Sequence, residues 1–421
     1  MKFHLETFGC KFNKADSALI ERILKEKGFK KASEREADFF ILNSCGVVEK
    51  TERKIMKRAL ELKKKKKKVI LTGCLPLISP KVCRKIANGI VGTANILSLP
   101  IVLKRVFEGK KSFFLKEKEI DKAKLKCFLL QENSCIAILP ISEGCLSFCS
   151  YCATKLARKN LRSFERKEIL KNIELALKSG SKEIQLTAQD LAIYGLDKGE
   201  FLLPKLLKEI SKIRRDFRIR LGMMSPQFAK KIFNKILKIL ENEKFYKFLH
   251  LPLQSGSNRI LRLMKRNYRV EDFLKLVKSF KKKFKNSLLA TDIIVGFPSE
   301  TEKDFKKAVK IIKEIKPDIL HLFKYSKREG TEASKMKDFP DRVKKERTRA
   351  LTKIWLELSQ EKNKKFVGKK FEALITEKRR NSFLARLSSY KAVILNEGKI
   401  GQFKKVKIID FKPNYLLGKT D

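Results

Sequence analysis

Residues 145–152 read Cys145-Leu146-Ser147-Phe148-Cys149-Ser150-Tyr151-Cys152, a C-x3-C-x2-C pattern that follows the apolar run 135–141. A loop this short can bring its three thiolates to one metal centre. Iron–sulfur clusters are held by cysteine thiolates, usually four of them, and structural zinc also takes four ligands. No fourth cysteine or histidine stands in this stretch. The incomplete set favours a cluster whose open iron binds a reagent; a zinc site completed by a distant residue is the alternative.

Three further cysteines, Cys10, Cys45 and Cys74, each follow a segment with the pattern of a β-strand. We expect strands at 2–8, 37–43 and 69–72, alternating with helices at 14–27, 49–62 and 80–87. This alternation favours a doubly wound parallel α/β sheet, whose ligand sites lie at the carboxyl ends of the strands. The three thiolates would meet at that edge, which predicts a second cluster with one open iron. For any one of these cysteines alone, a buried structural role is the alternative.

The overall composition limits the partners and the compartment. Lys+Arg number 99 against 47 Asp+Glu, a formal net charge of +52 over 421 residues. Such a surplus favours a polyanion, with nucleic acid ahead of an acidic membrane, although a lysine-rich composition bias explains part of it. Because we find no signal peptide and no apolar run long enough to span a membrane, we expect a cytoplasmic protein.

The remaining cysteines and the histidines carry less information. Nine cysteines in a long chain of this kind favour metal binding or catalysis over a disulfide framework. Cys83, Cys127 and Cys135 fit neither triplet and are interpreted as core or surface residues. The three histidines are scattered along the sequence, which argues against a histidine-rich metal site.

The central part of the chain repeats a strand followed by a helix. Strands are expected at 135–141, 183–188, 217–223, 248–253, 289–296 and 318–325, separated by helices at 166–178, 204–214, 228–240, 272–284 and 302–315. Six units are too few for a closed eight-unit barrel and predict an open (β/α)6 partial barrel. Gln189, Arg220, Gln254 and Gly296 lie at strand ends and are candidates for cofactor contacts, although each could instead be structural. Gly296 would allow a close backbone approach.

The carboxyl-terminal part changes to short strands after a connecting helix expected at 351–365. Strands at 371–376, 391–395 and 405–409 predict a small β-barrel of the kind that binds single-stranded nucleic acid. Its candidate phosphate contacts and stacking faces are Lys378, Arg379, Arg380, Lys404, Lys405, Phe383, Tyr390 and Phe403. Alternatively, the aromatic residues form the core of the barrel. The predicted division is therefore 1–105, a linker at 106–134, the partial barrel at 135–363, and the small barrel at 364–421.

Over nearly its full length the chain resembles the methylthiotransferase family of radical S-adenosylmethionine (SAM) enzymes. The matching motifs are TFGCKFNKADS, LNSCGVVEKTE, LTGCLP, EGCLSFCSYCATKLARKNLRS, HLPLQSGSNRIL, TDIIVGFPSETEKDF, VGKKFEALITE and NYLLGKT. Within the family, CATKLARKNLRS, RLGMMSP and HLPLQSGS are most similar to the archaeal and eukaryotic branch. That branch acts on N6-threonylcarbamoyladenosine beside the tRNA anticodon. The resemblance implies an N-terminal methylthiotransferase domain, a radical SAM domain and a C-terminal TRAM barrel.

The resemblance also implies a reaction with two clusters. Cys145, Cys149 and Cys152 would hold a 4Fe–4S cluster whose open iron chelates SAM, and Cys10, Cys45 and Cys74 a second 4Fe–4S cluster that binds the sulfur donor. One electron would cleave SAM to a 5′-deoxyadenosyl radical, which removes hydrogen from carbon 2 of the adenine. A second SAM would methylate the sulfur. Because cofactors do this chemistry, no acid–base residue is assigned.

The implied partners are the tRNA anticodon stem-loop, an electron donor and a sulfur source, and we expect a monomer. One alternative is the same reaction on isopentenyladenosine in tRNA, or on an aspartate of a ribosomal protein. The net charge of +52 favours RNA over a protein substrate. A second alternative is a non-catalytic, cluster-bearing RNA-binding protein. Two open cysteine triplets argue against it, because a structural cluster is normally closed by a fourth ligand.

Overall fold

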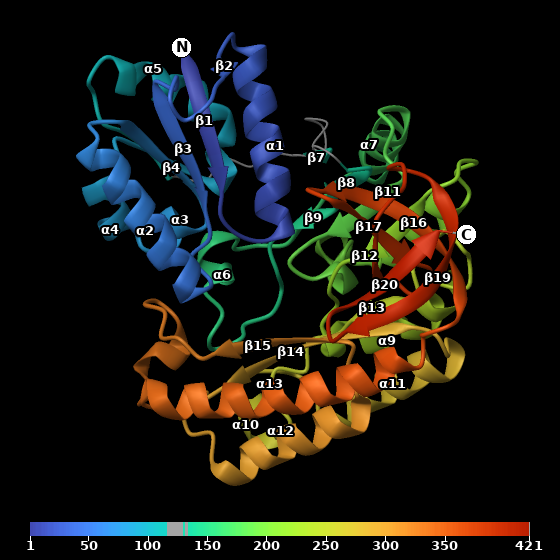
Figure 1. Ribbon diagram of the computed structural model, residues 1–421. Coiled ribbons are helices and arrows are strands. Elements are labelled where there is room, and N and C mark those ends of the chain that lie inside the picture. Colours follow the sequence, from blue (N-terminus) through green and yellow to red (C-terminus); the bar gives the residue numbers. More distant parts are fainter. Residues whose placement is uncertain (116–128, 131–133, 421) are drawn as a thin grey trace. The chain divides into compact units, whose positions relative to one another are not determined.

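The computed structural model describes residues 1–115, 129–130 and 134–420 (Figure 1). Two compact units can be distinguished. The first takes its described residues from Met1–Leu129, Ile138–Asn172 and Arg328–Ser334, and the second from Leu130–Ala137, Ile173–Lys327 and Lys335–Asp421. Both cysteine triplets lie in the first unit. Cys127 lies outside the described residues, as does much of the expected linker at 106–134.

The first unit contains a six-stranded parallel sheet, which confirms the doubly wound α/β prediction. Its strand order is β2 (Lys30–Lys31), β1 (Lys2–Thr7), β3 (Phe39–Ser44), β4 (Lys68–Gly73), β5 (Gly89–Gly92) and β6 (Ser112–Phe114). Strand β6 comes from within the segment expected to be a linker. Three residues are too few to show a strand pattern, so the sequence did not reveal this edge of the sheet.

Helices cover both faces of this sheet (Figure 1). They are α1 (Lys11–Glu26), α2 (Glu49–Lys64), α3 (Leu75–Ile78), α4 (Pro80–Ile86) and α5 (Leu99–Phe107). On one face, Ile55 and Leu62 of α2 and Cys83 of α4 pack against Phe40 and Leu42 of β3. Every residue of β3 is buried, as expected for a central strand of a doubly wound sheet. Cys83 is therefore a core residue.

The central strands form the expected open partial barrel. One sheet has the order β12 (Arg218–Leu221), β11 (Glu183–Thr187), β8 (Ile136–Pro140) and β7 (Leu129–Leu130), and the other β13 (Phe248–His250), β14 (Leu288–Val295) and β15 (Ile319–Lys324). An isolated parallel bridge pairs Ile219 of β12 with Phe245, which precedes β13 in the chain. The helices between the strands are α7 (Arg166–Lys178), α8 (Leu203–Ser211), α9 (Pro226–Ile239), α10 (Asn258–Leu263), α11 (Val270–Lys283) and α12 (Glu302–Ile315).

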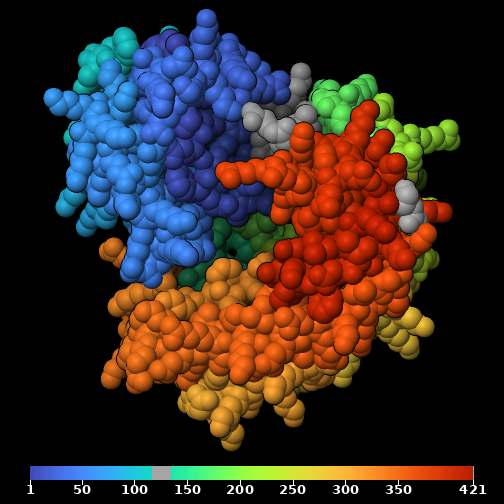
Figure 2. Space-filling model, in the orientation of Figure 1, coloured from blue at the N-terminus to red at the C-terminus, as the bar shows by residue number. Residues whose placement is uncertain are grey.

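Helix α13 (Asp341–Lys364) begins earlier than expected and leads into a closed five-stranded barrel. Around the barrel the order is β16 (Lys370–Arg379), β17 (Ser382–Leu387), β18 (Ala392–Leu395), β20 (Tyr415–Thr420) and β19 (Phe403–Lys412). Strands β17 and β20 were missed from the sequence. Figure 2 shows α13 and the barrel, in orange to red, forming one continuous surface of the second unit.

The three aromatic residues that were candidates for stacking faces have different surroundings. Tyr390 is buried, with its ring 4.9 Å from that of Tyr246 and 5.0 Å from that of Phe248. Phe403 lies under the guanidinium of Arg218, 4.5 Å away. Burial excludes Tyr390 as a base-stacking face, but it packs with Tyr246 and Phe248 outside the barrel core. Phe383 packs against the barrel core, as the alternative interpretation has it.

None of the helices in the described parts of the chain combines the length and the apolar character needed to cross a membrane.

Candidate functional site

Cys10, Cys45 and Cys74 come together at one edge of the first sheet. Each lies just past the carboxyl end of its strand, and β1, β3 and β4 are adjacent in the sheet. Burial raises the pKa of Cys74 to about 11, and the nearby Cys10 and Cys45 thiols raise it as well. Burial likewise raises the pKa of Cys45, with Cys10 adding to the rise. The three sulfurs are therefore within electrostatic reach of one another.

Two glycines allow the chain to pass this closely. A Cβ on Gly9, whose φ is +140°, would lie 2.9 Å from the Cβ of Cys45. A Cβ on Gly73, whose φ is +89°, would lie 2.4 Å from the carbonyl oxygen of Ser44. Neither distance is tolerable, so the Gly-Cys pairs at 9–10 and 73–74 are required for the strand ends to approach. Cys10 is exposed whereas Cys45 and Cys74 are buried, so the triplet opens on the Cys10 side.

Arg158 is a buried guanidinium beside Cys74. Its Nη2 donates to Asp16 at 2.5 Å, its Nη1 donates to Glu143, and its plane lies 4.2 Å from the ring centre of Phe12. Burial opposes its charge, but Asp16, Glu143 and Cys74 raise the pKa of Arg158 well above its usual range. In turn, Arg158 lowers the pKa of Cys74 through its charge and a hydrogen bond. A permanent positive charge thus lies against one sulfur of the triplet.

Arg328 is a second buried guanidinium near the same triplet. Its Nη1 donates to Glu52 of α2. It also lies close enough to Cys45 to act against the burial that raises the pKa of that thiol. Neither arginine was identified from the sequence. Their carboxylate partners Asp16 and Glu52 lie 142 and 276 residues away along the chain, so no local pattern indicates them.

The second triplet, Cys145, Cys149 and Cys152, lies in one loop between β9 (Ser142–Glu143) and α6 (Thr154–Ala157). All three cysteines are partly exposed. The loop is held by backbone hydrogen bonds, among them Cys152 N–H to the Cys149 carbonyl at 3.1 Å. The N–H of Ser147 donates to the Cys145 sulfur at 3.4 Å. Burial raises the pKa of Cys152, and Cys149 adds to that rise.

Each triplet offers three cysteine sulfurs as metal ligands. Three thiolates suit a 4Fe–4S cluster in which the fourth iron has no protein ligand. A shared hydrophobic cluster connects them. Cys74 and Ile78 of the first triplet's neighbourhood pack with Ala153 and Ala157, which follow Cys152. The segment 328–334 is also tied to the loop, because Ala333 N–H donates to the Ser150 carbonyl at 2.7 Å.

The four candidate cofactor contacts belong to the second unit. Gln189 follows the carboxyl end of β11. The backbone of Gln254 forms two hydrogen bonds with β14, at Asp292 and Ile294, and so continues the pairing of β13 with β14. Its φ is 68°. Arg220 is buried, with its guanidinium 4.7 Å from the ring centre of Phe248. Burial lowers the pKa of Arg220. For all four candidates, contact with SAM stays a prediction.

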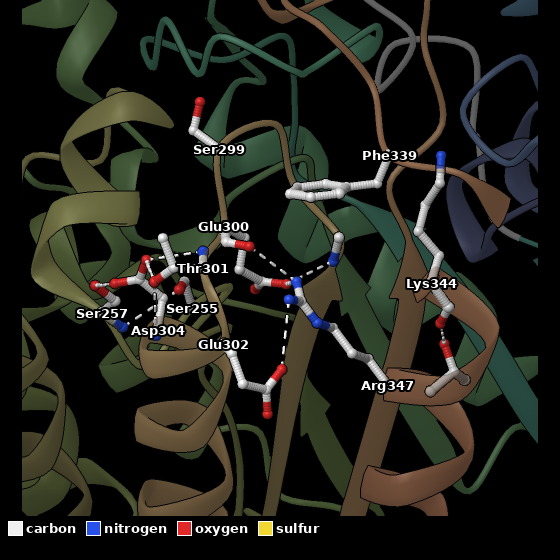
Figure 3. A network of polar contacts seen from close by, with 12 residues as sticks. Ser255, Ser257, Ser299, Glu300, Thr301, Glu302, Asp304, Phe339, Lys344 and Arg347 are labelled. Carbon is white, nitrogen blue, oxygen red and sulfur yellow. Dashed lines mark hydrogen bonds and ion pairs between the residues drawn. The ribbon is translucent and has the colours of Figure 1, made fainter. Parts of the chain in front are cut away.

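Gly296 has a structural reason to be glycine. Its φ is +67°, and a Cβ there would lie 2.3 Å from the Cγ of Lys344 on α13. Figure 3 shows the network that orders the following loop: the Glu300 carboxylate accepts from Gly296 N–H at 2.8 Å and from Arg347 at 2.5 Å. Thr301 and Asp304 cap α12 reciprocally. The Lys344 side chain therefore accounts for the glycine at this position, and a contact of Gly296 with SAM stays a prediction.

Two of the three histidines, far apart in sequence, come together with a carboxylate in the second unit. Asp292 Oδ1 accepts from His250 Nε2 at 2.9 Å and from His321 Nδ1 at 2.8 Å. Burial would raise the pKa of Asp292, but these two hydrogen bonds hold it well below its usual range. The nitrogen and oxygen atoms of these three residues that could bind a metal lie within 4.8 Å of one another, a meeting that the scattered positions in the sequence did not indicate. In this arrangement the Asp292 carboxylate accepts one hydrogen bond from each histidine ring.

The chain is similar to known proteins over nearly its full length. Three family models match: the uncharacterized protein family UPF0004 over residues 2–92, the Radical SAM superfamily over 139–312 and the TRAM domain over 364–420. A protein of Archaeoglobus fulgidus named "Probable threonylcarbamoyladenosine tRNA methylthiotransferase" is 46% identical over 99% of this chain and 98% of its own. The human "Threonylcarbamoyladenosine tRNA methylthiotransferase" is 32% identical over 99% of this chain and 73% of its own.

Solved structures show the same fold at low identity. The radical S-adenosylmethionine methyltransferase TsrM of Kitasatospora setae superposes with a TM-score of 0.58 at 12% identity, over 79% of this chain and 75% of that one. The cobalamin-dependent S-adenosylmethionine radical enzyme OxsB gives a TM-score of 0.52 at 11% identity, over 85% of this chain and 56% of that one.

Proposed function

Because this chain belongs to the threonylcarbamoyladenosine tRNA methylthiotransferases of the radical SAM superfamily, we propose that it converts N6-threonylcarbamoyladenosine beside the tRNA anticodon to its 2-methylthio derivative. The observation that carries the proposal is similarity over 99% of the chain to relatives named for this one reaction. The isopentenyladenosine and ribosomal-protein alternatives are not favoured, since the archaeal and human relatives are named for the threonylcarbamoyl substrate.

Two sets of residues would hold the cofactors. Cys145, Cys149 and Cys152 would hold a 4Fe–4S cluster whose open iron takes SAM, and Cys10, Cys45 and Cys74 a second 4Fe–4S cluster that takes sulfur. When bound, these groups supply one-electron cleavage of SAM to a radical that removes a hydrogen atom from carbon, and a sulfur for transfer. The cysteine-only donor sets support this assignment.

The chain's own contribution is positioning and charge. Burial of Cys45 and Cys74 keeps water from two sides of the first triplet and leaves access at Cys10. Arg158 and Arg328 offset negative charge that collects on the sulfurs. Gln189, Arg220, Gln254 and Gly296 remain candidates for orienting SAM. In this proposal residues 1–105 carry the sulfur site, 135–363 the SAM chemistry and 364–421 RNA binding, with 106–134 as the linker.

The net charge of +52 and the TRAM match support tRNA as the partner. The basic residues predicted for phosphate contacts, Lys378, Arg379, Arg380, Lys404 and Lys405, are all exposed on the barrel. We expect the anticodon stem-loop to be the part bound, with the target base unstacked from its neighbours. An electron donor and a sulfur source complete the reaction, and the enzyme would act as a monomer in the cytoplasm.

The test is mass spectrometry of tRNA nucleosides from cells with and without the gene. Loss of 2-methylthio-N6-threonylcarbamoyladenosine, with accumulation of its precursor N6-threonylcarbamoyladenosine, is the expected result. An unchanged nucleoside profile would refute the proposal.

A further inference from the structure

His250, Asp292 and His321 form a cluster of three possible metal ligands in the second unit, apart from both cysteine triplets. They lie on the adjacent strands β13, β14 and β15. Asp292 is paired directly with His321, and His250 is paired with Ala290, two residues before Asp292. Because side chains alternate between the two faces of a strand, this register places all three on one face of the sheet. The pairing of the strands therefore brings the cluster together.

The distances within the cluster suit a bound ion. Asp292 Oδ1 lies 2.9 Å from His250 Nε2 and 2.8 Å from His321 Nδ1, and the two imidazole ring centres are 5.3 Å apart. A small divalent ion holds nitrogen and oxygen ligands at about 2.1 Å, so two ligands at right angles lie about 3 Å from each other. The two hydrogen bonds thus keep each nitrogen at the spacing from the carboxylate oxygen that a shared ion requires. An ion bound here would replace these hydrogen bonds.

Access and charge indicate which kind of ion would fit. The side chain of His321 is 44% exposed, which leaves one side of the cluster open to solvent. Asp292 supplies one negative charge, and Arg220 adds a positive charge nearby, 4.7 Å from the ring centre of Phe248, which lies 6.5 Å from that of His250. Because electrostatic attraction for a cation is weak here, bonds to imidazole nitrogen must hold the ion. This condition favours Fe²⁺ or Mn²⁺ over Ca²⁺ and Mg²⁺, which prefer oxygen ligands.

We propose that His250, Asp292 and His321 bind one divalent ion of the Fe²⁺ or Mn²⁺ type, each through one ligand atom. Two histidines and one carboxylate on one side of an ion form a facial triad, which leaves coordination positions open for water or another oxygen ligand. The open positions would lie on the exposed side, at His321. The site uses none of the six cysteines, so this inference does not depend on the proposed function.

The experiment titrates Mn²⁺ into the full-length protein after anaerobic reconstitution, and electron paramagnetic resonance counts the Mn²⁺ that stays free in solution. Thiolates favour softer metals, so the cysteines compete little for this probe. The test variants are His321→Asn and His250→Gln, whose amides can still donate a hydrogen bond to Asp292 but have no imidazole nitrogen. His4→Asn is the matched control, since His4 lies in the first unit, with its Nδ1 3.1 Å from the Ala32 carbonyl oxygen.

We expect wild type and His4→Asn to bind a single Mn²⁺ per chain, which an excess of Mg²⁺ does not displace. Each test variant should bind Mn²⁺ at least about tenfold more weakly, because one of the three protein ligands is lost. Iron content and circular dichroism should stay the same in every variant, which checks that the fold is intact. No bound Mn²⁺ in wild type at about 1 mM free ion would overturn the inference. Equal affinities in wild type and both test variants would overturn it as well.

Discussion

The two cysteine triplets of the first unit are built in opposite ways. Cys145, Cys149 and Cys152 come from a single loop, are partly exposed, and are held mainly by local hydrogen bonds. Cys10, Cys45 and Cys74 come from three strands of one sheet, and two of them are buried beside arginines. The three sulfurs of the loop come from eight consecutive residues, so the short chain segment itself brings them near one another. The other triplet needs the whole sheet, and with it come buried charges.

This difference matches the tasks proposed for the two sites. A partly exposed loop leaves room for a reagent as large as SAM at its open iron. The sheet triplet, two of whose three cysteines are buried, leaves less room and suits a small sulfur ligand. We therefore expect damage to the loop triplet to remove the radical chemistry, and damage to the sheet triplet to remove only the sulfur transfer.

The largest effect is expected from replacing Cys145, Cys149 and Cys152 with alanine. Reconstituted wild-type protein should contain about eight irons and eight sulfides, two four-iron clusters, and the variant about half of each. SAM cleavage and methylthiolation should both disappear. Iron analysis and chromatography of 5′-deoxyadenosine measure these outcomes. A wild-type protein that holds zinc in place of iron would contradict the assignment.

Alanine at Cys10, Cys45 and Cys74 should separate the two sites. Because the radical would be made at the other triplet, 5′-deoxyadenosine should still form from SAM while no methylthio product accumulates. Both products can be measured in one reaction by mass spectrometry. Normal methylthiolation by this triple variant would show that the sheet triplet has another role.

The same contrast explains what the sequence could and could not reveal. The loop triplet was visible as a spacing, and the sheet triplet as three strands each ending in cysteine. Both signals are local. The arginines were not visible, because Arg158 meets Asp16 across 142 residues and Arg328 meets Glu52 across 276. A buried guanidinium and a solvated one look alike in a chain with so many basic residues.

Errors in the fold have similar causes. Strand β6, three residues long, carries too little pattern to be recognised. For Tyr390 the sequence leaves a stacking face and a core position open, because an aromatic residue near basic ones fits both; it packs in a core with Tyr246 and Phe248. The meeting of His250 and His321 at Asp292 depends on the order of β13, β14 and β15, which no local signal contains.

A smaller effect, on stability, is expected from Arg158→Met. The change leaves the buried Asp16 and the partly buried Glu143 without their cation. Breaking a buried ion pair in this way typically lowers the free energy of unfolding by about 3–5 kcal/mol. Urea unfolding of the cluster-free protein, followed by circular dichroism, measures the loss. Adding Asp16→Asn and Glu143→Gln should recover part of it. A loss below about 1 kcal/mol, as for an exposed pair, would show that this buried pairing is not what stabilises the sheet triplet's surroundings.

The smallest effect is expected from Lys155→Met at the loop triplet. Lys155 donates from Nζ to the Cys145 carbonyl at 2.5 Å and lies 4.8 Å from the ring centre of Phe148, which is exposed. One such hydrogen bond is worth about 0.5–1 kcal/mol, so iron should leave the loop site about two- to fivefold faster. Anaerobic chelation measures the rate, in a background with Cys10, Cys45 and Cys74 replaced by alanine. Stripping of all the iron would instead make Lys155 essential to the loop.

The most direct test offers the reconstituted enzyme, with SAM, a reductant and sulfide, two anticodon stem-loops that differ only in the target nucleoside. One carries N6-threonylcarbamoyladenosine and the other isopentenyladenosine. Mass spectrometry of the digested RNA should show the 2-methylthio product from the threonylcarbamoyl substrate alone. Product from the isopentenyl stem-loop alone would contradict the assigned substrate, and product from neither would contradict the assigned reaction.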